Sequence, residues 1–216
     1  MTIDTENLLN SIMESLSRIE YIRPEDIPDI ELYMDQVTTF MDSRLRTTTR
    51  NPGDDKVLTK TMINNYAKND LLPPPIRKKY SREHVLLLIF IYYFKGVMSI
   101  NDIQVLLKPI TDKYFNKKGG FDLEAVYREV FSMEEEEVEL LKEDVRRNYG
   151  KAQQTFQDAP EEDAEFLQKF SFICLLSFDV YVKKLMIEKL VDDLATREKG
   201  AAGAEKTDKK EKKHKE

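Results

Sequence analysis

The 216-residue sequence contains one cysteine, no tryptophan, two histidines and only seven glycines. The single cysteine excludes an internal disulfide and any metal site built from several cysteines. It is also typical of a reducing compartment, so we expect a cytoplasmic protein. Few glycines and a charged fraction of 34% favour a mainly α-helical chain over a β-sandwich.

Long apolar runs are absent as well. The longest uncharged stretches, residues 85–94 and 170–178, are far shorter than the roughly 20 residues that span a bilayer, so we expect no membrane segment. The chain has no P-loop, GxGxxG or GxSxG motif. His84 has no partner for a catalytic triad in the sequence, and Cys174 lies in an apolar run that predicts a buried, inert thiol. We therefore expect no enzyme activity, no metal and no cofactor.

Charge is distributed unevenly around a net value of −6. Residues 44–82 hold ten Lys/Arg and three Asp/Glu, a balance of +7, whereas residues 1–43 carry −8 and residues 121–165 carry −10. An acidic chain with one basic segment would meet a polyanion through that segment, although solvated surfaces would also account for the pattern.

Apolar periodicity divides the chain into four parts. We expect an N-terminal helix within residues 1–24, a folded domain over 25–110, a helical region over 121–196 and a disordered charged tail over 197–216. Within the domain, a helix is expected to start at Pro28 and bury Ile30, Tyr33 and Val37. The helical region is read as two helices, at about 121–149 and 161–196.

The stretch from Leu58 to Leu107 contains three helix signals. Thr59 is expected to cap a helix with Ile63 and Tyr66 inside, and Pro73-Pro74-Pro75 prevents its continuation. A basic segment, Arg77-Lys78-Lys79, follows on what we predict to be a short extended link. Ser81 then caps a helix that is apolar on every face. A third helix begins at a capping box after Ser99 and is expected to end at Lys108-Pro109.

The first of these helices has an exposed face with the composition expected of a helix that binds in the DNA major groove. That face consists of Lys60, Thr61, Asn64, Asn65 and Lys68, and no acidic residue occurs from Lys56 to Asn69. Asparagine can pair with adenine, threonine can contact a thymine methyl, and lysine can bind phosphate. The residues Arg77, Lys78, Lys79 and Arg82 are predicted to hold phosphates beside this helix. An ordinary solvated helix face is the alternative.

The order of these features resembles the DNA-binding domain of MerR-type regulators, a winged helix-turn-helix. The resemblance covers about residues 25–110 and is carried by Leu71-Leu72-Pro73-Pro74, Tyr80-Ser81, Gly96, Ser99-Ile100 and Leu106-Leu107. The phrases IPDIELYMDQVTTFM and LTKTMINNYAKNDLLPPP also resemble a bacterial family catalogued only as a domain of unknown function and regarded as MerR-like. The resemblance implies DNA binding and a dimer formed through a long helix after the domain.

Several positions depart from the MerR pattern. Asn64, Ala67 and Asp70 stand where that family usually has Arg, Glu and Gly. The wing lacks a Gly-Tyr-Arg element, and the link from Leu45 to Leu58 exceeds a helix-turn-helix turn of three or four residues. The operator geometry and the promoter-untwisting mechanism of MerR proteins are therefore not carried over.

The sequence thus predicts a mainly α-helical transcription regulator that binds double-stranded DNA, with repression favoured over activation. The Phe166–Leu194 helix has more apolar surface than one helix can hide, so it packs either on the domain or on a second chain as a homodimer. The alternative function is a helical protein-interaction module without DNA binding.

Overall fold

The computed structural model describes residues 5–16, 22–117 and 119–213. Most of this chain is helical. The helices are α1 (Thr5–Leu16), α2 (Met34–Leu45), α3 (Lys60–Lys68), α4 (Arg82–Phe94), α5 (Ile100–Tyr114), α6 (Leu123–Ser132), α7 (Glu134–Gln153) and α8 (Glu161–Lys213). Two short 3-10 turns, η1 (Pro24–Asp26) and η2 (Arg46–Thr48), and two strands, β1 (Leu32–Tyr33) and β2 (Lys79–Tyr80), complete the described elements.

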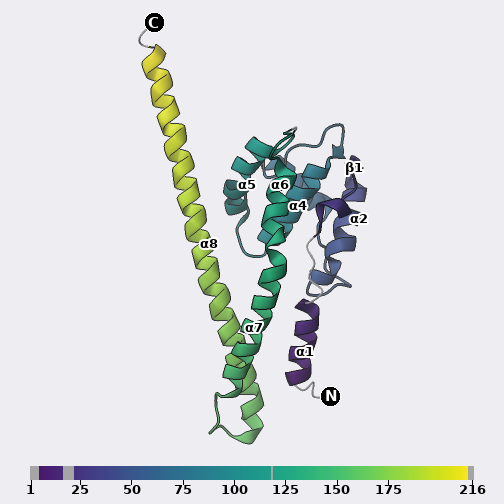
Figure 1. Cartoon of the computed structure of the whole chain (residues 1–216), viewed down its shortest axis with the longest axis vertical. Helices are drawn as coiled ribbons and strands as arrows, with labels where there is room; N and C mark the ends of the chain where they lie inside the picture. The colour runs from purple at the N-terminus through teal and green to yellow at the C-terminus, as the bar shows by residue number, and fades with distance from the viewer. Residues whose placement is uncertain (1–4, 17–21, 118, 214–216) are drawn as a thin grey trace.

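Figure 1 shows a compact unit built from α2 to α6, from which α7 runs away and α8 returns antiparallel to it. The helix α4 lies at the centre of this unit because seven consecutive apolar residues, Val85 to Ile91, are all buried. Residues from α2, α3, α5 and α6 pack around it, among them Met41, Ile63, Ile103 and Tyr127. The prediction of a central helix apolar on every face is confirmed.

Two core helices, α4 and α5, begin at the caps that the sequence predicts. Ser99 Oγ accepts from the Asp102 amide at 3.2 Å, and Asp102 Oδ2 accepts from the Ser99 amide at 3.2 Å, which is the reciprocal capping box. At the start of α4, His84 Nδ1 accepts from the Ser81 amide at 3.0 Å.

Strand β1 corrects the expected helix start at Pro28. Leu32 and Tyr33 pair antiparallel with Tyr80 and Lys79, respectively, and α2 begins only at Met34. Alternation along the strand buries Leu32 but leaves Tyr33 55% exposed, and Ile30 before it is 64% exposed. The expected burial of Ile30 and Tyr33 is therefore wrong, whereas that of Val37 is confirmed.

The helix α5 also differs from its predicted end at Pro109, since it continues to Tyr114. Proline removes one backbone hydrogen bond from a helix interior. Burial on both sides offsets this loss, because Leu107 is buried and Ile110 and Tyr114 pack against the core. The expected single helix over 121–149 is instead divided at Met133 into α6 and α7.

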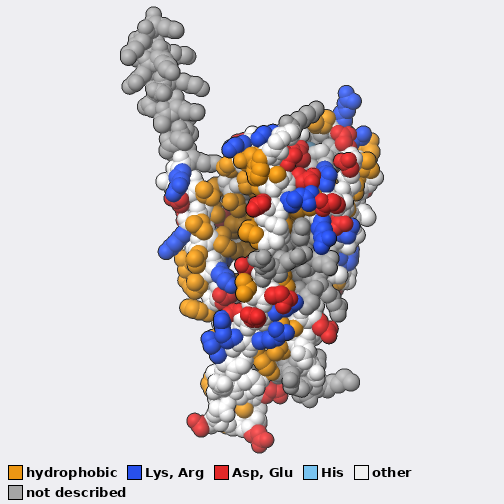
Figure 2. Space-filling view, viewed as in Figure 1, with side chains coloured by type: hydrophobic (Ala, Val, Ile, Leu, Met, Phe, Trp, Pro, Cys, Tyr) orange, Lys and Arg blue, Asp and Glu red, His pale blue; other side chains and the backbone are white. Residues whose placement is uncertain are grey.

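The helix α8 is covered on only part of its surface. Its first half packs on α7 and its second half reaches α5, where Val191 is buried. Hydrophobic side chains nevertheless form a band along α8 in Figure 2. The helix runs to Lys213, through the charged segment for which composition predicts disorder. Among the described residues, no helix combines the length and the apolar character needed to cross a membrane.

Candidate nucleic-acid interface

The helix α3 presents the polar face that the sequence predicts. Thr59 Oγ1 accepts from the Met62 amide at 3.2 Å and caps the helix, and Ile63 and Tyr66 turn into the core. The remaining side chains face solvent: Lys60, Thr61, Asn64, Asn65 and Lys68 are all exposed. A short helix with buried apolar anchors and small hydrogen-bonding groups outside has the dimensions and chemistry to enter the major groove.

The end of α3 depends on a left-handed residue. Asp70 has a φ of 53°, and the Leu71 amide donates to the Tyr66 carbonyl at 2.9 Å, so the chain reverses and buries Leu71 and Leu72. Glycine adopts this conformation without steric cost. Asp70 therefore holds a backbone conformation that glycine would adopt at lower steric cost.

A tight hairpin turn follows the prolines, in place of the predicted extended link. The Lys79 amide donates to the Ile76 carbonyl at 2.9 Å, and the Ile76 amide donates to the Lys79 carbonyl at 3.1 Å. Arg77 and Lys78 form the two-residue loop, with φ values of 51° and 64°. Two positive φ angles define a type I′ turn, which normally contains Asn-Gly.

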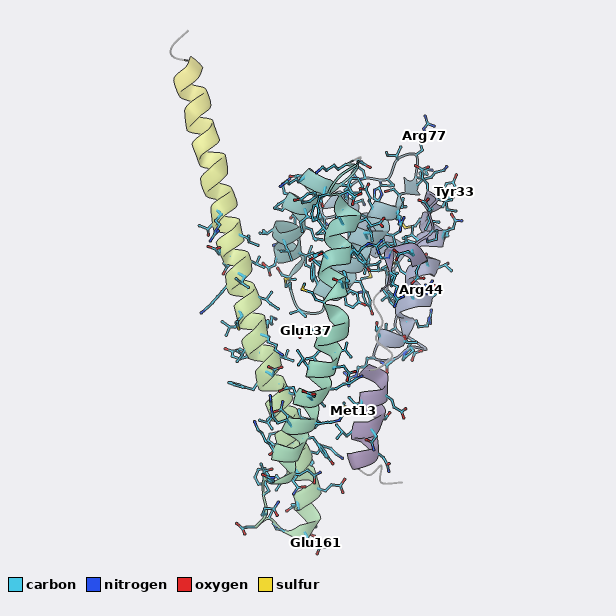
Figure 3. The ribbon with its side chains drawn as sticks, in the orientation of Figure 1. Met13, Tyr33, Arg44, Arg77, Glu137 and Glu161 are labelled. Carbon is cyan, nitrogen blue, oxygen red and sulfur yellow. The ribbon has the colours of Figure 1, made fainter. Side chains whose placement is uncertain are left out.

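The backbone of the basic turn is strained, because neither loop residue is a type that adopts positive φ easily. A left-handed conformation costs an ordinary residue roughly 1–2 kcal/mol, and both loop residues are lysine or arginine. Within the described residues, neither Arg77 nor Lys78 forms an ion pair, and Figure 3 shows Arg77 at the edge of the molecule. Strain retained at an exposed cationic tip suggests that the side chains have a function.

The strand β1 connects this turn to α3. Lys79 is in β2, and its Nζ lies 3.4 Å from Glu31 Oε2 and 5.8 Å from the centre of the Tyr33 ring. On the other side, the Lys60 ammonium pairs with the Asp35 carboxylate at the start of α2. The structure thus brings the α3 face and the Arg77-Lys78-Lys79 turn to the two sides of residues 31–35.

Arg82 does not join this group. Its Nη2 donates to the Pro24 carbonyl at 2.5 Å, and its Nη1 lies 3.3 Å from Glu124 Oε2 on α6. Arg128 extends the network, since it lies 2.6 Å from Glu25 and 2.9 Å from Glu124. These bonds tie η1 and α6 to the start of α4, so the Arg82 guanidinium is engaged inside the domain.

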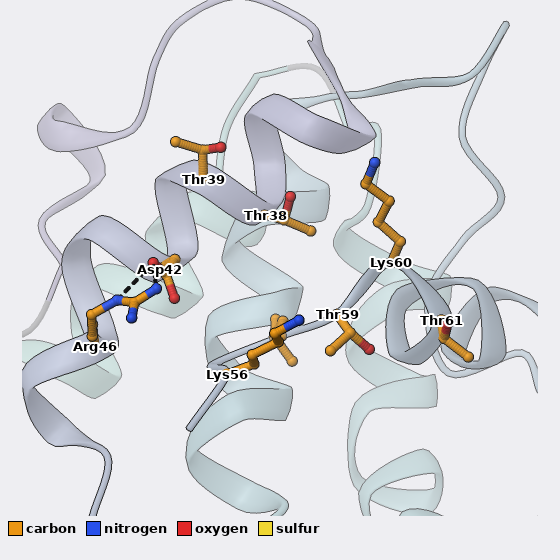
Figure 4. Close-up of a pocket in the computed structure, with 9 residues that line it drawn as sticks. Thr38, Thr39, Asp42, Arg46, Lys56, Thr59, Lys60 and Thr61 are labelled. Carbon is orange, nitrogen blue, oxygen red and sulfur yellow. Dashed lines mark hydrogen bonds and ion pairs between the residues drawn. The ribbon is translucent and has the colours of Figure 1, made fainter. Parts of the chain in front are cut away.

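A polar hollow of about 440 Å³ separates α2 from the first turn of α3 (Figure 4). Threonine hydroxyls and cations line it: Thr38, Thr39, Arg46, Lys56, Thr59, Lys60 and Thr61. Asp42 is its one acidic lining residue and is bonded to Arg46 Nε at 2.8 Å. Hydroxyls and ammonium groups near a helix N-terminus suit a phosphate group.

The long link before α3 is fixed to the C-terminal end of α4. Thr48 Oγ1 and Tyr92 Oη lie 2.6 Å apart, and Lys95 Nζ donates to the Val57 carbonyl at 2.7 Å. Burial lowers the Lys95 pKa from its ordinary value of 10.5. The two anchors hold α3 against the core although the link exceeds an ordinary helix-turn-helix turn.

His84 is buried beneath the proline segment, at the start of α4. Its ring is buried and makes edge contacts with Tyr80 and Phe115 at centroid distances of 5.5 and 4.9 Å. Burial lowers its pKa below 6.5, and the nearby Pro73 and Pro74 carbonyls oppose that shift only partly. Neither carbonyl meets the buried Nε2 in hydrogen-bond geometry. His84 therefore connects Tyr80 and Phe115 to the cap of α4.

Other candidate chemistry is sparse in the described part of the chain. No group of three or more His, Cys, Asp or Glu side chains there could hold a metal ion. Cys174 is exposed, which corrects the prediction of a buried thiol. Its apolar sequence context is misleading because α8 is uncovered over much of its surface.

Sequence reasoning missed Glu31 and Asp35, the acidic partners of Lys79 and Lys60. Local sequence carries no signal for them, because Leu32-Tyr33-Met34 is a continuous apolar run and the two lysine partners lie far away in the sequence.

The described elements define a helical domain with a two-stranded ribbon and a basic turn. The chain belongs to a family described as a domain of unknown function, DUF1836, whose model matches residues 22–130. That range extends from just before η1 through nearly all of α6 and excludes α7 and α8. Neither a curated protein nor a solved structure matches the chain.

Proposed function

We propose that this protein is a sequence-specific, DNA-binding transcription regulator, most simply a repressor, whose residues 25–110 form a winged helix-turn-helix of MerR type. In this proposal α2 and α3 are the helix-turn-helix, α3 enters the major groove, and the turn at Arg77-Lys78 is the wing. The observation that carries the proposal is the exposed acid-free face of α3 beside a strained basic turn. The expectation of a non-enzymatic, cytoplasmic protein is part of the same proposal.

The residues divide into two roles. Thr61, Asn64 and Asn65 would contact base edges, because amide and hydroxyl groups read the pattern of donors and acceptors in the major groove. Lys60, Lys68, Arg77, Lys78 and Lys79 would contact phosphates. Arg82 is left out of the interface because its guanidinium holds Pro24 and Glu124.

A homodimer through the Phe166–Leu194 part of α8 completes the proposal. In the described part of α8, ten large hydrophobic side chains are exposed, among them Phe166, Phe178 and Leu190 at 68, 68 and 65%. At about 100 Å² each they expose on the order of 1,000 Å² per chain, compared with about 800 Å² per partner in a stable interface. Two copies would also supply the two half-sites from which dimeric DNA readers gain affinity.

The same exposed helix favours the second candidate, a helical protein-interaction module that does not bind DNA. A module of this kind would use α8 for a different protein, and the basic turn would be an ordinary solvated surface.

Electrophoretic mobility shift at two salt concentrations, with duplex from the region upstream of the chain's own gene, separates the two candidates. The Lys78→Ala/Lys79→Ala variant should bind every sequence more weakly and with a flatter salt dependence. Each lost phosphate contact lowers the slope of log K against log salt by about 0.9. Asn64→Ala should mainly relax sequence preference.

The matched control is Lys108→Ala/Lys113→Ala on α5, which removes the same charge away from α3 and from the Phe166–Leu194 segment. Unchanged DNA binding in both interface variants would remove the residue assignments. No shift of the wild-type protein at low salt would favour the interaction module.

A further inference from the structure

Two carboxylates lie between the α3 face and the basic turn. Along residues 31–35, Glu31, Tyr33 and Asp35 are exposed while Leu32 is buried; Glu31 directly precedes β1, and Asp35 lies in the first turn of α2. Glu31 reaches Lys79 at 3.4 Å, and Asp35 pairs with Lys60. We call Glu31 and Asp35 the acidic pair.

The acidic pair divides the cations of the interface into two classes. Lys60 and Lys79 are already neutralised by carboxylates of the same chain. In contrast, Lys68, Arg77 and Lys78 form no ion pair among the described residues. Because the side chains of Asp35 and Glu31 are 75 and 53% exposed, approaching phosphates would meet them as well as the lysines.

We infer that Glu31 and Asp35 set a threshold for DNA binding: they compete with DNA phosphates for Lys79 and Lys60 and thereby keep a duplex without base contacts to α3 largely unbound. This inference rests on the proposed DNA-binding function. Phosphate contacts supply nearly all of non-specific affinity, whereas base contacts are made only on the correct site. An internal competitor for phosphate contacts therefore weakens binding to every duplex, and only the correct sequence offers the base contacts to α3 that compensate for this loss.

The strength of these ion pairs suits such a role. Pairs between exposed side chains contribute little to stability, so each lysine can exchange its carboxylate for a phosphate without unfolding the domain. After that exchange, the displaced carboxylate remains near the DNA and repels it. Like-charge juxtaposition of this kind is a general way to reject wrong partners.

A purely structural role for the acidic pair makes a different prediction. If Asp35 served only to hold α3 against α2, and Glu31 only to hold β2 beside β1, removing their charges would loosen the interface. Thermal stability and DNA affinity would then fall together. The competition model predicts the opposite direction for affinity, with stability nearly unchanged.

The experiment measures DNA binding of the full chain by fluorescence anisotropy, with unrelated duplexes and with the upstream duplex, from 50 to 200 mM salt. The variants are Glu31→Gln, Asp35→Asn and the double variant, which keep side-chain size and remove charge. The control is Asp112→Asn on α5, which breaks an exposed pair with Lys108 of 3.0 Å and adds the same charge elsewhere. Thermal unfolding of each variant confirms that it is folded.

We expect affinity for unrelated duplexes to rise about threefold to tenfold per variant, and the salt slope of the double variant to steepen by up to about 1.8 as two lysines gain phosphates. Affinity for the upstream duplex should rise by a similar factor, because both complexes lose the same competition, and Asp112→Asn should change neither affinity. Unchanged or weaker non-specific binding by the double variant, while the wild type binds DNA, would overturn the inference. Failure of the wild type and all variants to bind any duplex would instead overturn the proposed function.

Discussion

Replacing Arg77-Lys78 by Asn-Gly should make the protein more stable and a poorer DNA binder. Both residues have positive φ, at 51° and 64°, in the turn type that favours Asn-Gly. Removing the left-handed penalty at both positions raises the free energy of unfolding by roughly 2 kcal/mol. The greater entropy of glycine in the unfolded chain offsets part of this gain. A net gain of about 1 kcal/mol corresponds to a rise in Tm of about 2–4 °C for a chain of this size.

The loss of binding can be estimated from the charges removed. If each tip cation neutralises one phosphate, its removal lowers the salt slope by about 0.9, which is about fivefold in affinity at 0.15 M salt. The Asn-Gly variant should therefore lose roughly 30-fold in affinity for any duplex, with a salt slope shallower by about 1.8.

The matched variant Arg77→Ala/Lys78→Ala separates strain from charge. Alanine pays the same left-handed penalty as arginine and lysine, so this variant should lose the same affinity without gaining stability. Urea unfolding and anisotropy on both variants provide the comparison. Equal stability of the two variants would refute the strain argument, and wild-type affinity in either would refute the wing assignment.

Three further predictions concern the supporting structure. Burial lowers the His84 pKa, so the unfolded chain binds the proton more readily and stability should fall from pH 6.5 towards 5. The His84→Gln variant, which retains a capping side chain, should show a smaller fall when urea unfolding is measured across this pH range. A pH profile unchanged from that of the wild type would contradict the prediction. Asp70→Gly should raise stability by about 1 kcal/mol in urea unfolding, since glycine removes the left-handed penalty at φ 53°; destabilisation would show that the aspartate side chain is required. Met186→Ser/Leu190→Ser should convert a dimer into a 25.4 kDa monomer in analytical ultracentrifugation, whereas Lys183→Ser should not; a wild-type monomer would contradict the dimer.

Local signals predicted the starts of α3, α4 and α5 well. Thr59, Ser81 and Ser99 were recognisable caps, and the apolar spacing of Ile63 and Tyr66 indicated the buried side of α3. Caps and apolar periodicity depend on residues within one or two turns of a helix, so they can be recognised without knowledge of the tertiary structure.

Elements whose partners are distant in sequence were not predictable in this way. Tyr33 fits a helix face, but Leu32 and Tyr33 become a strand because Lys79 and Tyr80 pair with them. The type I′ turn could not be predicted either, because Arg-Lys is an unfavourable sequence for this turn type. In both cases tertiary pairing overrides local preference.

The candidate site was predicted in part. The exposed residues of α3 and the basic turn were identified from their residue types, and the structure places them on the two sides of β1. The internal role of Arg82 was missed because Glu124 and the Pro24 carbonyl come from segments far away in the sequence. The acidic pair was missed because its lysine partners are also distant.

The salt dependence of DNA binding by the wild-type protein tests the central claim most directly. Anisotropy with the upstream duplex should show binding that weakens with salt. A slope of log K against log salt of about −2.7 per subunit is expected if Lys68, Arg77 and Lys78 bind phosphates, and about −4.5 if Lys60 and Lys79 also bind. Absence of binding to any duplex at 50 mM salt would contradict the account.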